Sequence, residues 1–208
     1  MELRELLIQF NEDRKNKKEL KLFELLNIYN EHAKEVFKSI AEITIEEKKK
    51  IPESEQIPFN DPKKWIKVEN VSCLFIDMAN SSILDYQNYE KRVAQVYQCF
   101  TDTLIKIMDI FKASYIDIKG DGAFALFDQE NSTIYALLAA VTYKTYFENI
   151  LRPLILEKTK NKVNLNYRTG ITIGDVIFKR MGLKGDKKNE VWTNSTVNNC
   201  YKITSKVE

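Results

Sequence analysis

The sequence predicts an α+β domain, ferredoxin-like or polymerase-palm-like, in which a mixed sheet carries helices on one face and follows a helical N-terminal arm. The predicted elements of the domain come in the order strand, helix, hairpin, helix, hairpin and helix. Residues 1 to about 40 instead show helical periodicity alone. We therefore expect two regions, an arm with its linker over residues 1–66 and one domain over residues 67–208.

The composition excludes several classes of protein. A chain of 208 residues is long enough for one domain and an appendage, and 44% apolar with 30% charged residues is typical of a soluble globular protein. The net charge of +2 gives no strongly basic surface, so we expect no nucleic-acid partner. Three cysteines, a charged N-terminus and no long apolar run predict a cytoplasmic protein with free thiols and no membrane insertion.

The arm is predicted to be an amphipathic helix. Apolar residues recur at three- and four-residue spacing, namely Leu22, Leu25, Leu26, Tyr29, Ala33, Val36 and Phe37. This apolar face is expected to pack on the main domain or on a second copy of the arm; a membrane-surface role is less favoured because acids and bases are mixed throughout. The charged run 46–50 and the prolines that follow it predict a solvated linker.

The first strand of the domain ends in an acid. An apolar run from Val71 leads to Asp77 and then through small polar residues toward a helix. Such a junction places a carboxylate beside backbone N–H groups that can hold phosphate. The long helix that follows has one apolar stripe, assigned to the core: Tyr89, Val93, Val96, Tyr97, Phe100, Leu104, Ile107, Met108 and Phe111.

A hairpin over residues 115–127 places a second acid near the first. Two apolar arms flank a Gly120-Asp121 turn, which puts Asp121 at the tip. If this hairpin neighbours the strand that ends at Asp77, the two carboxylates converge and repel each other unless a cation lies between them. Hard oxygen ligands near a phosphate site suit Mg²⁺ or Mn²⁺.

The remaining elements are a helix, two strands and a final helix. The second helix of the domain is marked by Ile134, Leu137, Leu138 and Val141. Residues 163–173 alternate between apolar and polar side chains, and Gly174-Asp175 is predicted to turn the chain into another strand at 176–178. Helical residues resume near Thr196.

Four short motifs carry a family resemblance. They are Phe75-Ile-Asp77 with Ser82, Lys119-Gly-Asp121 with Ala125 and Phe127, Arg168-Thr-Gly170-Ile-Thr-Ile-Gly174-Asp-Val176, and Val191-Trp192 with Val197-Asn198. In this order they resemble the class III nucleotidyl cyclase catalytic domain over roughly residues 67–205. The resemblance implies a head-to-tail homodimer with catalytic sites at the interface.

The resemblance also assigns the metal and phosphate ligands. Asp77 and Asp121 would bind two Mg²⁺ or Mn²⁺ ions per site, one activating the ribose 3′-hydroxyl and the other holding the triphosphate. The backbone from Met78 to Ser82 would meet the phosphates. Lys184 resembles the basic residue of a flexible loop that reaches the triphosphate in some members; the alternative is a solvated loop lysine.

The facing subunit is implied to contribute two further residues. Asn198 matches the asparagine that orients the ribose. Lys202 stands where the family has an arginine that stabilises charge on the α-phosphate, so the charge is kept and the bidentate fork is lost. An exposed helix lysine is the other interpretation of Lys202.

Base selection is where the chain departs from the purine cyclases. Those enzymes carry a Lys or a Glu ahead of the second metal aspartate, at a position that we assign to Tyr115 here. A second base-contacting position falls on Val191 or Glu190. A bulky phenol shortens the pocket and offers one hydroxyl, which favours a pyrimidine; the alternative is a strand aromatic that faces the core.

This pattern resembles the pyrimidine cyclases of the Pycsar antiphage system. The resemblance implies synthesis of cyclic UMP or cyclic CMP from UTP or CTP, with UTP favoured, and a separate effector that responds to the product. The alternatives are a catalytically silent nucleotide-binding dimerisation module and a purine cyclase. The chain stops ten residues after Asn198, where the family continues into more sheet, so we expect a shortened or missing C-terminal part.

Overall fold

The computed structural model describes residues 22–57, 61, 63–81, 90–160, 162–182 and 188–206. The chain divides into two compact units, Met1–Thr44 and Ile45–Glu208. In the first unit, helix α2 (Leu22–Lys38) leads into the short 3-10 helix η1 (Ser39–Glu42). The predicted arm is helical over Leu22–Lys38, where the apolar residues Leu26, Tyr29 and Phe37 are exposed, and its first part, residues 1–21, lies outside the described residues.

The second unit is built on a six-stranded sheet. Strands β3 (Tyr115–Lys119), β4 (Gly122–Phe127), β2 (Lys64–Ala79), β5 (Asn166–Gly182) and β6 (Lys188–Thr193) lie side by side in that order, and β1 (Thr44–Lys48) also pairs with β2. The four neighbouring pairs along this path are antiparallel.

Strand β1 contains part of the charged run that was expected to be a linker. The carboxylate of Glu46 lies 2.7 Å from Lys64 Nζ on β2, and most of the strand's side chains are exposed. Charged side chains on an outer strand keep its free edge from pairing with another chain. The short 3-10 helix η2 (Ser54–Gln56) follows.

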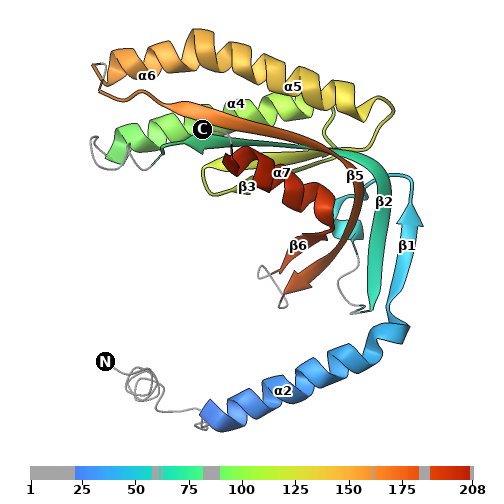
Figure 1. Ribbon diagram of the computed structural model, residues 1–208. Helices are drawn as coiled ribbons and strands as arrows, with labels where there is room; N and C mark the ends of the chain where they lie inside the picture. The colour runs from blue at the N-terminus through green and yellow to red at the C-terminus, as the bar shows by residue number, and fades with distance from the viewer. Residues whose placement is uncertain are drawn as a thin grey trace. The chain divides into compact units, whose positions relative to one another are not determined.

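Helices cover both faces of the sheet (Figure 1). On one face lie α4 (Glu90–Ile110), α5 (Ser132–Tyr146), the π-helical turn η3 (Phe147–Leu151) and α6 (Arg152–Lys158), packed on Leu74 and Ile76 of β2. On the other face lies α7 (Ser195–Lys206), whose Val197 and Cys200 pack with Cys73 and Phe75. The predicted fold class is confirmed, with the addition that α7 occupies the face opposite the other helices.

The two helices predicted on the first face bury their residues differently. In α4 the expected stripe is buried at Val96, Phe100, Leu104, Ile107 and Met108, and Tyr89 lies outside the described residues. Helix α5 buries Ala136, Ala139 and Tyr143 instead, and the four residues that marked it in the sequence, Ile134, Leu137, Leu138 and Val141, are exposed. Because α5 is apolar all round, periodicity did not identify its inner side, and small alanines let it approach the sheet.

No helix within the described ranges is long and apolar enough to cross a membrane.

The predicted hairpin over residues 115–127 is confirmed as β3 and β4, with Gly120 at φ +64° in the turn. The predicted turn at Gly174-Asp175 is wrong, because β5 runs through these residues without a break. The second hairpin is formed by β5 and β6 instead.

The long pair β2 and β5 contains a bulge. Val68 pairs with Val176 and Val71 pairs with Gly174, so β2 has one more residue than β5 between these pairs. Asn70 takes up the extra length with φ +55°, as expected for a bulge. The Gly174-Asp175 pair in the sequence therefore lies opposite a bulge and is not a turn.

Candidate active site

The two predicted metal aspartates lie together. Asp77 is near the end of β2 and pairs with Gly122 of β4, the residue that follows Asp121 in the turn. Burial raises the pKa of Asp77 to about 6, and the charge of Asp121 adds to the rise. The sheet register therefore brings both carboxylates to one place, as the sequence predicted.

These two residues fit a divalent cation. The charge of Asp121 helps to raise the pKa of Asp77, so the two neighbouring carboxylates repel each other and a cation between them would relieve that repulsion. Among the described residues no group of three or more His, Cys, Asp and Glu side chains is clustered for a metal. A site with two carboxylates suits Mg²⁺ or Mn²⁺, because Mg²⁺ commonly takes its remaining ligands from substrate phosphates and water.

Arg168 begins one of the four motifs, but the sequence reasoning gave it no role in the site. It lies on β5 directly opposite Asp77 in the register, and its positive charge acts to lower the pKa of that carboxyl group. Its Nε is buried and has no hydrogen-bond partner. An arginine with an unused donor beside a metal-type carboxylate pair can take a phosphate oxygen.

The backbone that was expected to meet the phosphates begins within a strand, because β2 continues two residues beyond Asp77. Met78 and Ala79 continue β2 and pair with Tyr167 and Asn166 of β5, so they do not lie at a helix N-terminus. The Met78 side chain is buried in the core beneath α4 and α5, and only its backbone interacts with the Asp77 carboxylate. Ser82 and Lys184 lie outside the described residues.

Tyr115 lies on the sheet face that carries α7. Its ring packs against Trp192 at a centroid distance of 4.5 Å and against Phe124 at 5.7 Å, and its hydroxyl donates to Glu190 Oε2 at 3.2 Å. Burial raises the pKa of Tyr115 well above its usual value, so the hydroxyl stays protonated. The residue is thus both half-buried against the core and tied to a polar partner.

The two candidates for the second base position, Glu190 and Val191, lie on opposite faces of β6. Glu190 contacts Tyr115, whereas Val191 projects from the other face of β6 and is 38% exposed. Adjacent side chains of a strand point to opposite faces, so only one of the two can lie beside Tyr115. That residue is Glu190.

The Tyr115 cluster and the carboxylate pair share one sheet face. Tyr115 lies four residues before Lys119, which pairs with Gly122 beside Asp77. Four residues of β-strand span roughly 13 Å. Asp117, midway between them on β3, forms an ion pair with Lys119 at 2.5 Å.

Asn198 and Lys202 project from the exposed side of α7. They are one helical turn apart, and the intervening Cys200 and Tyr201 hold the helix to the sheet, the Tyr201 ring stacking on Phe75 at 4.3 Å. Lys202 lines a cavity of 370 Å³ together with Thr172, Asn199 and Lys206. Both predicted residues are therefore accessible to another molecule.

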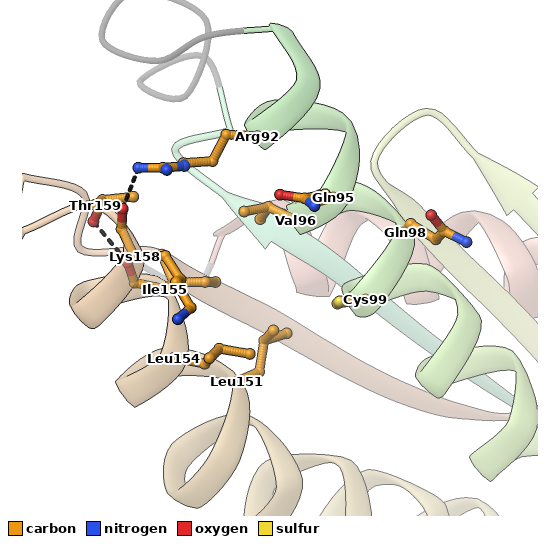
Figure 2. A pocket seen from close by; sticks show the side chains of 10 residues that line it. All are labelled: Arg92, Gln95, Val96, Gln98, Cys99, Leu151, Leu154, Ile155, Lys158 and Thr159. Atoms are coloured by element: carbon orange, nitrogen blue, oxygen red, sulfur yellow. Dashed lines mark hydrogen bonds between the residues drawn. The ribbon is translucent and has the colours of Figure 1, made fainter.

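A second cavity, of 390 Å³, lies on the helical face. It is lined by residues of α4, η3 and α6 and by Thr159, and Figure 2 shows Arg92 reaching across it to the Lys158 carbonyl. It contains none of the predicted site residues and is on the other side of the sheet from Tyr115. We assign it no part in the candidate active site.

Solved structures define the class of fold. An adenylyl cyclase-like ATP-binding protein of class III from Pseudomonas aeruginosa superposes with a TM-score of 0.67 at 18% identity, covering 91% of this chain and 41% of its own. The adenylyl cyclase CyaB from P. aeruginosa has a TM-score of 0.59 at 14% identity, covering 68% of this chain and 73% of its own. The guanylate cyclase domain of RhGC from Catenaria anguillulae, solved with GTP, has a TM-score of 0.56 at 16% identity, over 67% of this chain and 74% of its own. The chain has the class III nucleotidyl cyclase fold.

Within that class the chain is similar in sequence to proteins named uridylate cyclase. The one from Propioniciclava tarda is 28% identical over 168 residues, which are 80% of this chain and 54% of the relative. The one from Micromonospora echinofusca is 27% identical over 147 residues, 70% of this chain and 48% of the relative. The matched region thus spans about half the length of these curated relatives. No family model matches the chain.

Proposed function

We propose that this chain is a metal-dependent nucleotidyl cyclase that converts a pyrimidine nucleoside triphosphate to its 3′,5′-cyclic monophosphate and pyrophosphate. The observation that carries the proposal is the convergence of Asp77 and Asp121 beside Arg168 on one sheet edge. A paired carboxylate site with a neighbouring guanidinium suits a metal-bound triphosphate. The similarity to uridylate cyclases supports the same reaction.

Each residue has a defined task in this reaction. Asp77 and Asp121 would hold two Mg²⁺ or Mn²⁺ ions, which when bound supply acidity for the ribose 3′-hydroxyl and neutralise the leaving pyrophosphate. Arg168 binds phosphate oxygens. From a second copy of the chain, Asn198 orients the ribose and Lys202 stabilises charge on the α-phosphate. From the sequence alone, Ser82 and Lys184 are further phosphate contacts.

The covalent change is one displacement at phosphorus. The 3′-oxygen of the ribose forms a bond to the α-phosphorus, and the bond from that phosphorus to the bridging oxygen of the β-phosphate breaks. The 3′-hydroxyl proton leaves to solvent, and pyrophosphate carries away the electron pair of the broken bond. No oxidant or reductant is needed.

Tyr115 and the curated relatives both favour a pyrimidine substrate. The Tyr115 ring, fixed by Trp192 and Phe124, shortens the space available to a base. The name uridylate cyclase, carried by both relatives, favours UTP over CTP. Glu190 takes the second base position, which the sequence had left open between Glu190 and Val191.

The experiment is a turnover assay with each of the four nucleoside triphosphates and Mn²⁺. We expect cyclic mononucleotide mainly from UTP, with CTP second, and no product from Asp77→Asn or Asp121→Asn. Both variants should keep the wild-type fold by circular dichroism. If ATP or GTP gave most of the product, the assignment of Tyr115 to base selection would be overturned. Wild-type turnover in either aspartate variant would overturn the assignment of the metal site.

We further propose that the product is a signal in antiphage defence, made in the cytoplasm and read by a separate effector. The support is the resemblance to Pycsar cyclases and the similarity to uridylate cyclases. The test is to express the chain with its neighbouring genes and to measure phage plating and cyclic UMP during infection. Equal plating with wild type and Asp121→Asn would contradict the role.

A second candidate is a nucleotide-binding module without turnover. It is favoured by the superposition, over most of this chain, of a structure described as adenylyl cyclase-like and ATP-binding. Thermal-shift measurements with each nucleotide, run beside the turnover assay, separate the two candidates. Stabilisation by nucleotide without product would favour the binding module.

A further inference from the structure

The residue next to Glu190 on the neighbouring strand is Arg180, which no motif in the sequence marked. Arg180 on β5 and Glu190 on β6 are directly opposite each other in the register. Arg180 Nε lies 3.3 Å from Glu190 Oε1, and the side chains are 17% and 11% exposed. The two atoms form an ion pair without hydrogen-bond alignment, since both lack a hydrogen-bond partner.

The two oxygens of Glu190 thus serve two partners. Oε1 faces Arg180, and Oε2 accepts the hydroxyl of Tyr115 at 3.2 Å. A largely buried carboxylate is costly to hold without a positive partner. Without Arg180, Glu190 would have no positive partner and would turn toward solvent, which weakens its hydrogen bond to Tyr115.

The orientation of the Tyr115 hydroxyl follows from this contact. Its proton is directed at Glu190, so its oxygen presents only lone pairs elsewhere. Its ring packs against Trp192, which itself packs on Phe178 at 4.3 Å. Packing and one charge-assisted hydrogen bond therefore fix the ring and hydroxyl together.

We propose that Arg180 is a positioning residue for base selection: through Glu190 it holds Tyr115 in the place that excludes a purine, and it leaves the Tyr115 oxygen as an acceptor for an N–H group of a pyrimidine. The inference rests on the proposed function and deepens it. Uracil offers N3–H and cytosine offers its 4-amino group at the edge that such an acceptor would meet. Arg180 itself touches neither base nor phosphate.

The test compares Arg180→Gln with Arg180→Lys, which keeps the charge opposite Glu190. We expect Arg180→Gln to lower the preference for UTP over ATP by about tenfold, the scale of one hydrogen bond to a charged group. The change should appear in KM more than in kcat, and Arg180→Lys should restore most of the preference. Arg152→Gln, which breaks the ion pair with Glu148 on the helical face, is the matched control and should leave the preference unchanged.

A double-mutant cycle separates positioning from loss of packing. Tyr115→Phe removes the hydroxyl through which Arg180 is inferred to act and keeps the ring. In a Tyr115→Phe background, Arg180→Gln should therefore cause little further change in base preference. Additive effects of the two substitutions would overturn the inference. So would wild-type preference in Arg180→Gln.

A measurement of nucleotide binding in the absence of turnover tests the role of Arg180 separately from the proposed reaction. In a Trp65→Phe background, Trp192 is the one remaining tryptophan of the chain and reports nucleotide entry by its fluorescence, with Ca²⁺ in place of Mn²⁺. If the wild type binds UTP selectively but makes no product, the proposed reaction fails and the Arg180 comparison still stands on affinities. If the wild type binds no nucleotide, both are overturned.

Discussion

Asp77 and Gly122 face each other across β2 and β4 so closely that a Cβ on Gly122 would lie 2.7 Å from the Asp77 carboxylate oxygen and 2.7 Å from the Ile76 carbonyl oxygen. The absence of a side chain at this position leaves the carboxylate its room beside Asp121. The candidate metal site therefore depends on a glycine as well as on two acids.

Gly122→Ala should displace the Asp77 carboxylate. We expect Mn²⁺ affinity to fall by about tenfold or more and the free energy of unfolding to fall by about 1–3 kcal/mol, typical of overpacking. Isothermal titration with Mn²⁺ and urea denaturation measure the two effects. Gly120→Ala is the control: its φ of +64° makes alanine costly for stability, but its surroundings are open, so Mn²⁺ affinity should be kept. Equal Mn²⁺ affinities in both variants would contradict this view.

The raised pKa of Asp77 predicts a pH dependence of stability in EDTA. The pKa of about 6 in the folded state exceeds the ordinary aspartate value of 3.8. Between these two pH values the folded chain therefore binds more protons than the unfolded chain. The stabilising contribution of Asp77 to the free energy of unfolding is fully present below about pH 4 and is lost as the pH rises through 6. Relative to wild type, Asp77→Asn should therefore become more stable with rising pH, by about 1 kcal/mol after allowance for solvent screening. Urea denaturation of both proteins from pH 4 to pH 7.5 measures this, and a stability difference that does not change with pH would refute it.

Helix α7 approaches β5 closely at Gly170. A Cβ there would overlap Thr204 Oγ1 and lie 2.9 Å from the Cys200 carbonyl oxygen. Gly170→Ala should lower the free energy of unfolding by about 2–3 kcal/mol. Adding Thr204→Ala removes one of the two clashes and should recover part of the loss, although Thr204→Ala alone destabilises. No recovery in the double variant would show that α7 does not sit as described.

The exposed apolar residues of α5 should tolerate polar replacement. Leu137→Gln and Val141→Gln should each change the free energy of unfolding by less than about 0.5 kcal/mol, as surface substitutions do. Tyr143→Ala, on the buried side of the same helix, should cost about 3–5 kcal/mol. Thermal and urea denaturation of the three variants measure how much stability is lost on the exposed side of α5 and on its buried side. A large loss of stability in Leu137→Gln would mean that the exposed side of α5 is in fact covered by another part of the protein.

If the sites are composite, inactive subunits should complement each other. Asp121→Ala removes a metal ligand, and Asn198→Ala removes the residue proposed to come from a second copy. A mixture of the two variants can form one intact site per dimer, so turnover should recover to about a quarter of wild type for random pairing. Mixing two preparations of Asp121→Ala is the control. No recovery at any mixing ratio would place both residues in one chain's site.

Local patterns were sufficient to predict the carboxylate pair. The apolar run before Asp77 and the tight hairpin at Asp121 are each visible within a dozen residues, and only their adjacency had to be assumed. Arg168 was missed because its place opposite Asp77 depends on the register between β2 and β5, strands separated by about 90 residues. Arg180 was missed although Glu190 is only ten residues away, because the sequence predicted the turn at Gly174-Asp175 and so did not pair these two residues.

Other predictions failed where one local signal had two meanings. Gly174-Asp175 has turn composition, yet it lies within β5 opposite the bulge at Asn70. The charged run that starts at Glu46 is as suitable for an outer strand as for a linker. Which meaning applies is decided by pairing with β2, and that pairing is not contained in either segment.

The bulge at Asn70 also determines which amino acids β2 can accept along its length. Ile66 and Val68 before it, and Val71, Cys73 and Phe75 after it, all enter the core beneath α7, although strict alternation would assign the two groups to opposite sides. The hydrophobic phase of the strand is thus shifted midway by one inserted position. Loss of that position would turn the first half of β2 over, exchanging its aliphatic side chains for charged ones such as Lys67. Across homologous chains, insertions and deletions in this strand should therefore be rare, and should be matched by a change in the phase of the residues around them.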